Sequence, residues 1–138
     1  MATGMRMPRL ARLGPLLMLV ALATGCGDPG DGGTIEVSLA DLPCQKLNTA
    51  GIWESAPPPP ITDEACLWFP FATNTTYIFE HPLGRVPSFI IGYIAFGSDG
   101  TSATPGSGNA FLINGADAST VTIRNGQNQF FWLRLVLE

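Results

Sequence analysis

Two apolar runs joined by a tight corner dominate the hydrophobic pattern of the chain, between residues 75 and 96. The first run is β-branched or aromatic throughout, and strand alternation places Tyr77 and Phe79 on one face. The second run, residues 89–96, carries hardly any polar side chain, which indicates a strand buried on both sides or against an interface. Gly92 within it predicts a bulge or a close approach by another segment. The run is too short to cross a membrane, which takes about 20 apolar residues.

Shorter segments with the two-residue period of a strand lie before and after these runs. In segment 34–39, alternation turns Ile35, Val37 and Leu39 inward. Further strands are expected at residues 66–71, 110–114, 119–125 and 129–137, with turns at Asn114-Gly115 and Asn125-Gly126. No helical periodicity follows the first 33 residues. The predicted fold is therefore all-β, a small antiparallel β-sandwich of about seven or eight strands.

The last of these strands is apolar on both faces. Its inward face is expected to carry Phe131, Leu133, Leu135 and Leu137. Its other face carries Phe130, Trp132, Arg134 and Val136, which is unusually apolar for a surface in contact with solvent. This pattern predicts that a second sheet or a partner chain covers that face.

The first 25 residues have the pattern of an export signal. Arginines at positions 6, 9 and 12 precede the apolar stretch 13–23, and small residues lead to Cys26. This segment is expected to act as a secretory signal helix. Residues 26–33 are rich in glycine, proline and aspartate and predict a flexible tether. Residues 34–138 are then one domain of about 105 residues, enough for a modest core.

The end of this signal, Leu-Ala-Thr-Gly-Cys at positions 22–26, resembles the lipobox of bacterial lipoproteins. The resemblance implies that Cys26 becomes the first mature residue and carries acyl chains such as palmitate, which anchor the protein to a membrane. The alternative is a cleaved, soluble export signal in which Cys26 is incidental. Gly27 stands where an aspartate retains many such proteins at the inner membrane. The expected location is thus the cell envelope, at the outer membrane of a Gram-negative bacterium.

Charge and cysteine content limit the kinds of ligand and metal site expected for residues 26–138, the part that remains after the signal. It holds four basic and eleven acidic residues, a formal net charge of −7. That balance is poorly matched to nucleic acid or to anionic lipid headgroups, which need a basic patch. In an oxidising compartment, Cys44 and Cys66 are expected to form a disulfide that contributes about 3 kcal/mol. Two cysteines and the single His81 are too few for a zinc site, so we expect neither metal nor cofactor.

Trp53 and Trp68 lie on and beside the irregular segment that this disulfide would close. If they are exposed, their indoles could stack on a sugar ring, which makes them candidate ligand-binding residues. The alternative is that both plug a small core beneath the loop. The long polar loop 97–108 is a further candidate for ligand contact.

The corner between the two central runs reads His-Pro-Leu-Gly-Arg-Val-Pro, and its marked positions are His81, Leu83, Gly84, Arg85 and Pro87. This heptapeptide resembles a motif of small β-sandwich modules in phage tail and neck fibres. The resemblance implies a trimeric or otherwise self-associating sandwich with a binding or structural role and no catalytic activity. The alternative is a generic strand–turn–strand unit, in which the histidine and arginine cap turn carbonyls.

Catalytic chemistry finds little support in the sequence. His81 is the only candidate base for a nucleophile, and alternation sends its neighbour Glu80 to the opposite face. Asp63 and Glu64 are adjacent loop carboxylates rather than a facing hydrolase pair. We therefore expect a non-catalytic binding module for a glycan, a peptide or an envelope protein. A self-associating structural lipoprotein is the alternative, and a hydrolase is less favoured.

Overall fold

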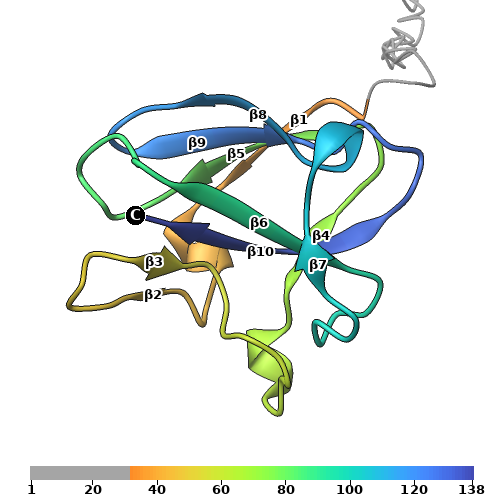
Figure 1. Ribbon diagram of the computed structural model, residues 1–138, viewed down its shortest axis with the longest axis horizontal. Helices are drawn as coiled ribbons and strands as arrows, with labels where there is room; N and C mark the ends of the chain where they lie inside the picture. The colour runs from red at the N-terminus through yellow and green to blue at the C-terminus, as the bar shows by residue number, and fades with distance from the viewer. Residues whose placement is uncertain (1–31) are drawn as a thin grey trace, which may run out of the picture.

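The structure is a computed structural model that describes residues 32–138. The predicted signal segment 1–25 and nearly all of the predicted tether 26–33 lie outside the described residues. The described part forms ten strands and three short 3-10 helices, arranged as two sheets packed against each other (Figure 1). The predicted fold class, an all-β sandwich, is confirmed.

The first sheet has four strands, in the order β1 (Thr34–Val37), β5 (Thr76–Glu80), β9 (Thr120–Arg124) and β8 (Leu112–Ala116). All neighbours in it are antiparallel except β1 and β5, which run parallel. This pair departs from the predicted antiparallel arrangement. The chain passes through the second sheet between β1 and β5, and so long a crossover lets it return in the same direction.

The second sheet has the order β2 (Lys46–Leu47), β3 (Trp53–Glu54), β10 (Phe131–Leu137), β6 (Ile90–Ala95) and β7 (Thr104–Pro105), with β4 (Phe69–Phe71) paired to the start of β10. The 3-10 helices span Leu39–Asp41, Glu64–Cys66 and Gly108–Ala110. The strands that sequence analysis did not expect are β2, β3 and β7. Each has two residues, too few to show alternation.

The core lies between the sheets and follows the predicted alternation of the long strands. The first sheet contributes Tyr77, Phe79, Val121 and Ile123, and β10 contributes Phe131, Leu133, Leu135 and Leu137. Phe69 of β4 joins the two layers, with its ring centroid 5.2 Å from that of Phe79 and 5.7 Å from that of Tyr77. Each fully buried side chain of this kind contributes roughly 1.5–3 kcal/mol.

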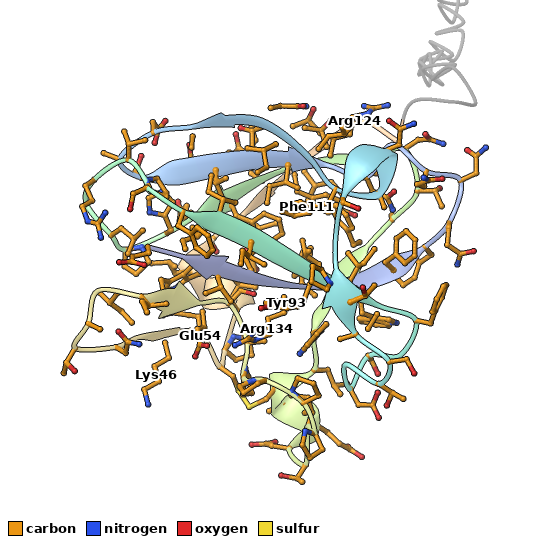
Figure 2. The ribbon with its side chains drawn as sticks, viewed as in Figure 1. Lys46, Glu54, Tyr93, Phe111, Arg124 and Arg134 are labelled. Carbon is orange, nitrogen blue, oxygen red and sulfur yellow. A yellow bond between two sulfur atoms is a disulfide. The ribbon has the colours of Figure 1, made fainter. Side chains whose placement is uncertain are left out.

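The central corner carries the chain from one sheet to the other, because β5 belongs to the first sheet and β6 to the second. Gly84 adopts a φ of 67°, as its place in the corner predicts. The close approach predicted at Gly92 is also confirmed. A Cβ there would lie 2.2 Å from the ring of Phe111, which occupies the space beside β6 (Figure 2).

Strand β1 differs from its predicted form. Only Val37 is buried, and Ile35 keeps 44% of its surface exposed. The strand stands at the edge of the first sheet, where one side has no neighbouring strand to cover it. Leu39 lies beyond the strand, in the first 3-10 helix, and is half-buried against the core.

Both predicted Asn-Gly turns are wrong. Asn114 and Gly115 lie within β8 at a register shift, and the chain turns three residues later around Asp117. Asn125 is fully buried, and β9 and β10, which it separates, belong to different sheets. Its amide nitrogen donates to the carbonyl oxygens of Phe71 and Gln129. Asn125 thus serves a buried amide network, and the left-handed backbone that a two-residue hairpin needs is not adopted there.

Candidate functional site

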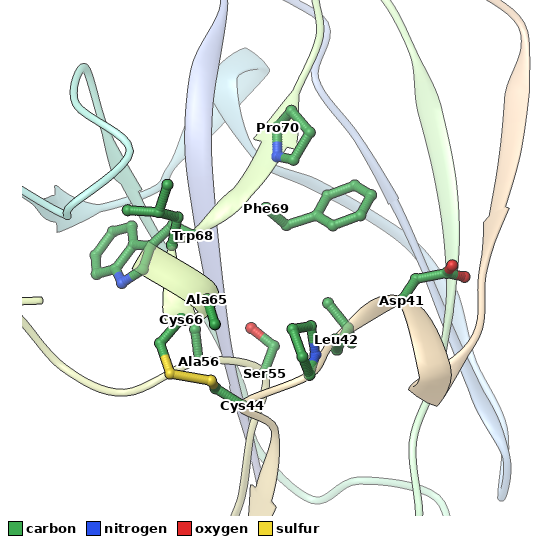
Figure 3. A pocket seen from close by; sticks show the side chains of 12 residues that line it. Asp41, Leu42, Cys44, Ser55, Ala56, Ala65, Cys66, Trp68, Phe69 and Pro70 are labelled. Carbon is green, nitrogen blue, oxygen red and sulfur yellow. A yellow bond between two sulfur atoms is a disulfide. The ribbon is translucent and has the colours of Figure 1, made fainter. Parts of the chain in front are cut away.

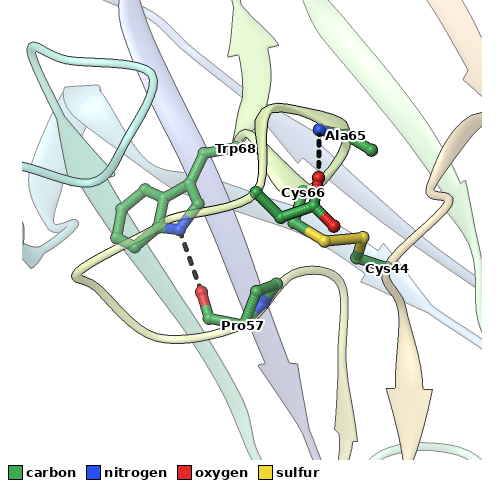
Figure 4. The surroundings of a disulfide bond; sticks show 6 residues. Cys44, Pro57, Ala65, Cys66 and Trp68 are labelled. Carbon is green, nitrogen blue, oxygen red and sulfur yellow. Dashed lines mark hydrogen bonds between the residues drawn. A yellow bond between two sulfur atoms is a disulfide. The ribbon is translucent and has the colours of Figure 1, made fainter.

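A disulfide between Cys44 and Cys66 holds a long loop against the second sheet (Figure 3, Figure 4). The predicted pairing is thus confirmed, with the two Cα atoms 5.2 Å apart. Within the loop, the Asp63 carboxylate accepts a hydrogen bond from the Ala65 amide at the start of the second 3-10 helix. These bonds fix the loop over residues 55–68 as one structural unit, here named the stapled loop.

The two tryptophans of this region are interior residues. Trp53 is 0% exposed and its Nε1 donates to Gln45 Oε1 at 2.7 Å. Trp68 is 1% exposed and its Nε1 donates to the Pro57 carbonyl at 3.1 Å (Figure 4). Stacking on a sugar requires an accessible ring face, so the structure argues against that role for both. Trp53 belongs to the main core between the sheets and Trp68 to a smaller core beneath the loop, so both fill the interior, as in the alternative interpretation.

The stapled loop also explains the apolar outer face of β10. Sequence analysis expected a second sheet or a partner chain to cover this face. Instead, Trp68 and Ala56 of the loop pack on Ala95 of β6, and Trp132 and Tyr93 are half-buried against them. A second, smaller core therefore lies outside the sandwich, between the loop and the second sheet.

Two hollows flank Trp68. The first, of about 240 Å³, lies beside the disulfide (Figure 3). Its polar groups already serve the fold: Ser55 Oγ accepts a hydrogen bond from the Leu135 amide at 2.8 Å, and the Asp41 carboxylate accepts from the Ser38 amide and hydroxyl. The pKa of Asp41 is lowered by these bonds from Ser38. This hollow therefore offers a ligand mainly an apolar surface.

The second hollow, of about 310 Å³, lies on the outer face of the second sheet. Ligand sites usually occupy several hundred Å³ and combine an apolar lining with a few fixed polar groups. This one has both, because its lining residues are Pro58, Pro59, Trp68, Tyr93, Ala103 and Arg134. We name it the Tyr93–Arg134 hollow.

Arg134 is the charged residue in the lining of this hollow, and strand pairing and hydrogen bonds fix its guanidinium in place. β10 and β6 pair in register at Arg134 and Tyr93, which sets the guanidinium 5.4 Å from the centre of the tyrosine ring. Its Nε donates to the Ala56 carbonyl at 2.8 Å, and Nη2 forms an ion pair with Glu54 Oε1 at 2.5 Å. The three side chains lie together on β3, β6 and β10 (Figure 2).

The chemistry of this cluster is that of a recognition surface. Arg134 is held in one orientation by a carbonyl, a carboxylate and an aromatic ring, so its charge is matched within the fold. Tyr93 is half-buried, and one side of its ring faces the Arg134 guanidinium. A half-exposed tyrosine beside fixed hydrogen-bonding groups can contact a flat, partly apolar ligand that carries hydroxyl or amide groups.

A third hollow, of about 390 Å³, lies on the outer face of the first sheet and is lined by Glu36, Asp41 and Glu80 among others. Asp41 caps the first 3-10 helix, and Glu80 accepts from the Leu39 amide at 3.2 Å. Within residues 32–138, no group of three or more histidine, cysteine or carboxylate side chains has an arrangement that could hold a metal ion.

The corner motif has a structural place in the fold. His81 is buried, and its Nε2 lies 3.2 Å from the Asp117 carbonyl oxygen; since a carbonyl only accepts, Nε2 carries the proton. The capped carbonyl thus belongs to the β8–β9 turn and not to the corner itself. Within the described chain, His81 Nδ1 is buried without a hydrogen-bond partner. Pro87 is buried, Leu83 packs on the core and Arg85 is exposed.

The structure does not bring the candidate catalytic residues together into one site. The protonated nitrogen of His81 faces a backbone carbonyl, while Glu80 is exposed at the end of β5. Asp63 and Glu64 are exposed on the stapled loop, where Asp63 serves as a helix cap. The Arg134–Glu54–Tyr93 cluster was not predicted. Its signal was the charged Arg134 in the middle of an otherwise apolar strand, since a buried charge requires a partner.

A scan against protein-family models and searches of curated proteins and of solved structures gave no match to this chain. Among the residues that the structure describes, no helix has the length and apolar character needed to cross a membrane.

Proposed function

We propose that this protein is a lipid-anchored envelope protein whose β-sandwich head is a non-catalytic binding module. The observation that carries the binding role is the Tyr93–Arg134 hollow, an apolar site with a fixed cation and an aromatic face. The disulfide supports it by holding the loop that forms one wall of the hollow. Among the ligand classes expected from the sequence, a glycan suits the hollow best, because a sugar ring presents an apolar face and hydroxyl groups together.

The test is binding of the purified protein to a panel of immobilised bacterial envelope glycans and peptides. Tyr93→Ala should weaken binding to the preferred glycan about ten-fold or more, since central aromatic residues dominate such sites. Tyr93→Phe keeps the ring and should retain most of the affinity. Phe89→Ala, at an exposed position at the opposite end of β6, is the matched control and should bind normally. Full binding by Tyr93→Ala would refute this assignment of the site.

The anchor is tested separately, by intact mass spectrometry of the protein extracted from cell envelopes. We expect a chain that begins at Cys26 and carries acyl groups, whereas Cys26→Ser should stay unacylated. The same spectra with and without reductant report the Cys44–Cys66 bond. An unprocessed chain that still contains residues 1–25 would contradict the proposed location in the outer membrane of a Gram-negative bacterium.

The alternative function is a self-associating structural lipoprotein, which the corner motif's resemblance to fibre modules suggests. The apolar outer face of strand residues 130–136, for which a partner chain was one of two expected covers, would be its interface. In the structure the stapled loop occupies part of that face, and Arg134 is buried beneath it. Sedimentation of the protein at high concentration distinguishes the two functions, because a scaffold requires stable oligomers and a binding module does not.

A further inference from the structure

One end of the sandwich carries an exposed aromatic cluster. Phe96 follows β6 and is 71% exposed, with its ring centroid 5.6 Å from that of Phe131. Phe130 precedes β10, is 39% exposed and packs edge-on against Trp132 at 5.4 Å. We name Phe96, Phe130, Phe131 and Trp132 the aromatic end; Phe131 is buried and Trp132 half-buried, so Phe96 and Phe130 are its exposed members. Large aromatic side chains exposed at one end of a domain mark a surface that meets another apolar phase.

The described chain begins at this same end. Gly32 donates its amide to the Asn74 carbonyl at 2.9 Å, and Asn74 in turn bonds to the β9–β10 connection that leads to Phe130. Arg124, the last residue of β9, also lies at this end (Figure 2). The C-terminus lies at the opposite end of the sandwich (Figure 1). The start of the described chain and the aromatic end are therefore neighbours.

The length of chain before Gly32 limits how far the head can stand from the proposed anchor. Six residues, from Cys26 to Asp31, separate the proposed lipid from the described domain. Six residues span at most about 20 Å when fully extended. A lipid on Cys26 would thus keep the end that carries Phe96 and Phe130 within reach of the bilayer surface.

From this placement we propose that the aromatic end docks on the membrane that holds the lipid anchor, with Phe96 and Phe130 in the interfacial layer of zwitterionic lipid. This proposal rests on the proposed function, because it takes the lipid on Cys26 as given. The surrounding side chains fit a neutral headgroup layer. Asn74, Gln127, Asn128 and Gln129 are uncharged amides, and Arg124 and Asp99 are of opposite sign. Aromatic rings at the level of the headgroups stabilise such contacts.

Docking at this end would set the orientation of the proposed binding site relative to the membrane. The Tyr93–Arg134 hollow lies on the outer face of the second sheet, and Arg134 is two residues along β10 from Trp132 of the aromatic end. A head seated on its aromatic end would hold this face at an angle to the membrane and accessible to a ligand of the envelope. Lipid contact would then orient the head in addition to restraining it.

Trp132 provides the readout, because Trp53 and Trp68 are buried and Trp132 packs on Phe130. The acylated protein extracted from cell envelopes is placed in phosphatidylcholine vesicles whose acyl chains are brominated near the headgroup. We expect bromine to quench Trp132 emission, and Trp132→Phe should remove the quenched component. Phe96→Ser and Phe130→Ser should each lower the ratio of docked to undocked heads about ten-fold, the loss expected for one buried phenylalanine. Phe89→Ser, exposed at the other end of β6, should leave quenching unchanged.

The possible results separate this proposal from the one on which it rests. An acylated protein with no quenching of Trp132 overturns the docking proposal and leaves the anchor intact. A chain that intact mass shows to be unacylated overturns both. If Phe96→Ser and Phe130→Ser instead change the sedimentation coefficient without affecting quenching, the aromatic end is an interface between copies of this chain, and the docking proposal is refuted.

Discussion

At the scale of single residues, the buried arginine Arg134 is the clearest case of a charge that needs partners inside the fold. Arg134 stands between Leu133 and Leu135 in the longest strand, and its guanidinium is buried beneath the stapled loop. A buried charge persists only with partners, and here a carbonyl, a carboxylate and a ring supply them. The sequence shows a charged residue within an apolar strand, but it does not show which of the eleven acidic residues is its counter-ion.

Replacing Glu54 tests this arrangement. Glu54→Ala leaves the buried guanidinium without its counter-ion and should lower the free energy of unfolding by about 3 kcal/mol. Glu54→Gln keeps an acceptor for Nη2 and should cost about 1 kcal/mol. Urea denaturation measures both. Glu64→Ala, an exposed carboxylate on the stapled loop, is the control and should change stability by no more than about 0.5 kcal/mol. Equal stability of Glu54→Ala and the parent would show that the ion pair with Glu54 does not stabilise the buried guanidinium.

Asp117 gives a prediction for pH. Hydrogen bonds from the Ser119 and Thr120 amides, and then from their hydroxyls, lower the pKa of Asp117 from 3.8 to about 2. Because the folded-state pKa is depressed, its stabilising effect on the β8–β9 turn is present above pH 3.8 and is lost as the pH falls through about 2. Carboxyl carbon NMR should show Asp117 titrating well below pH 3.8. A midpoint near that of an ordinary aspartate would contradict the turn geometry.

At the scale of elements, the alternation of the long strands was readable and their assignment to sheets was not. Tyr77, Phe79, Val121 and Ile123 face inward as predicted, because one buried face dictates which side chains are apolar. Nothing in residues 81–89 shows that the chain leaves one sheet for the other, since that depends on contacts distant in sequence. The hairpin turn predicted at Asn125 was wrong for the same reason, because its side chain donates a hydrogen bond to Phe71, which is distant in the sequence.

The packing of Phe111 on β6 can be tested at Gly92. Gly92→Ala would place a methyl group 2.2 Å from the ring of Phe111, so the ring must move and the core must repack. We expect unfolding free energy to fall by about 1–3 kcal/mol. Gly115→Ala is the matched control, because a Cβ at that position meets no atom within 4 Å. If both variants unfold at the same urea concentration, Phe111 does not pack on β6 as described.

The stapled loop gives the second prediction at this scale. The double variant Cys44→Ala/Cys66→Ala removes a bond between residues 22 apart and should lower unfolding free energy by about 3 kcal/mol. It should also expose Trp68, whose fluorescence would shift to longer wavelength and become accessible to iodide. Because Trp68 and Ala56 cover the outer face of the second sheet, ligand affinity should fall together with these changes. Unchanged quenching of Trp68 would show that the loop holds without its disulfide.

At the scale of the whole molecule, the sequence predicted the class of fold and the disulfide, whereas its two candidate ligand-binding tryptophans are core residues. Trp53 and Trp68 were candidates because tryptophan is a common contact residue, yet Trp53 fills the main core and Trp68 the small core under the loop. The site that we propose beside Trp68 instead presents Tyr93 and Arg134, which are 41 positions apart in the sequence and paired in register on neighbouring strands. A site assembled by strand pairing leaves no local motif to read.

The most direct test of the proposed binding site is a ¹H–¹⁵N NMR titration of the protein with the glycan that binds best on the envelope panel. The side-chain signals of Arg134 Nε and Trp68 Nε1 report the two walls of the hollow, and both groups have known hydrogen-bond partners. The account predicts that these signals and the Tyr93 amide shift together with ligand concentration. If they stay fixed while the signals of Glu36 and Glu80 in the third hollow shift, the ligand binds on the first sheet and the proposed site is wrong.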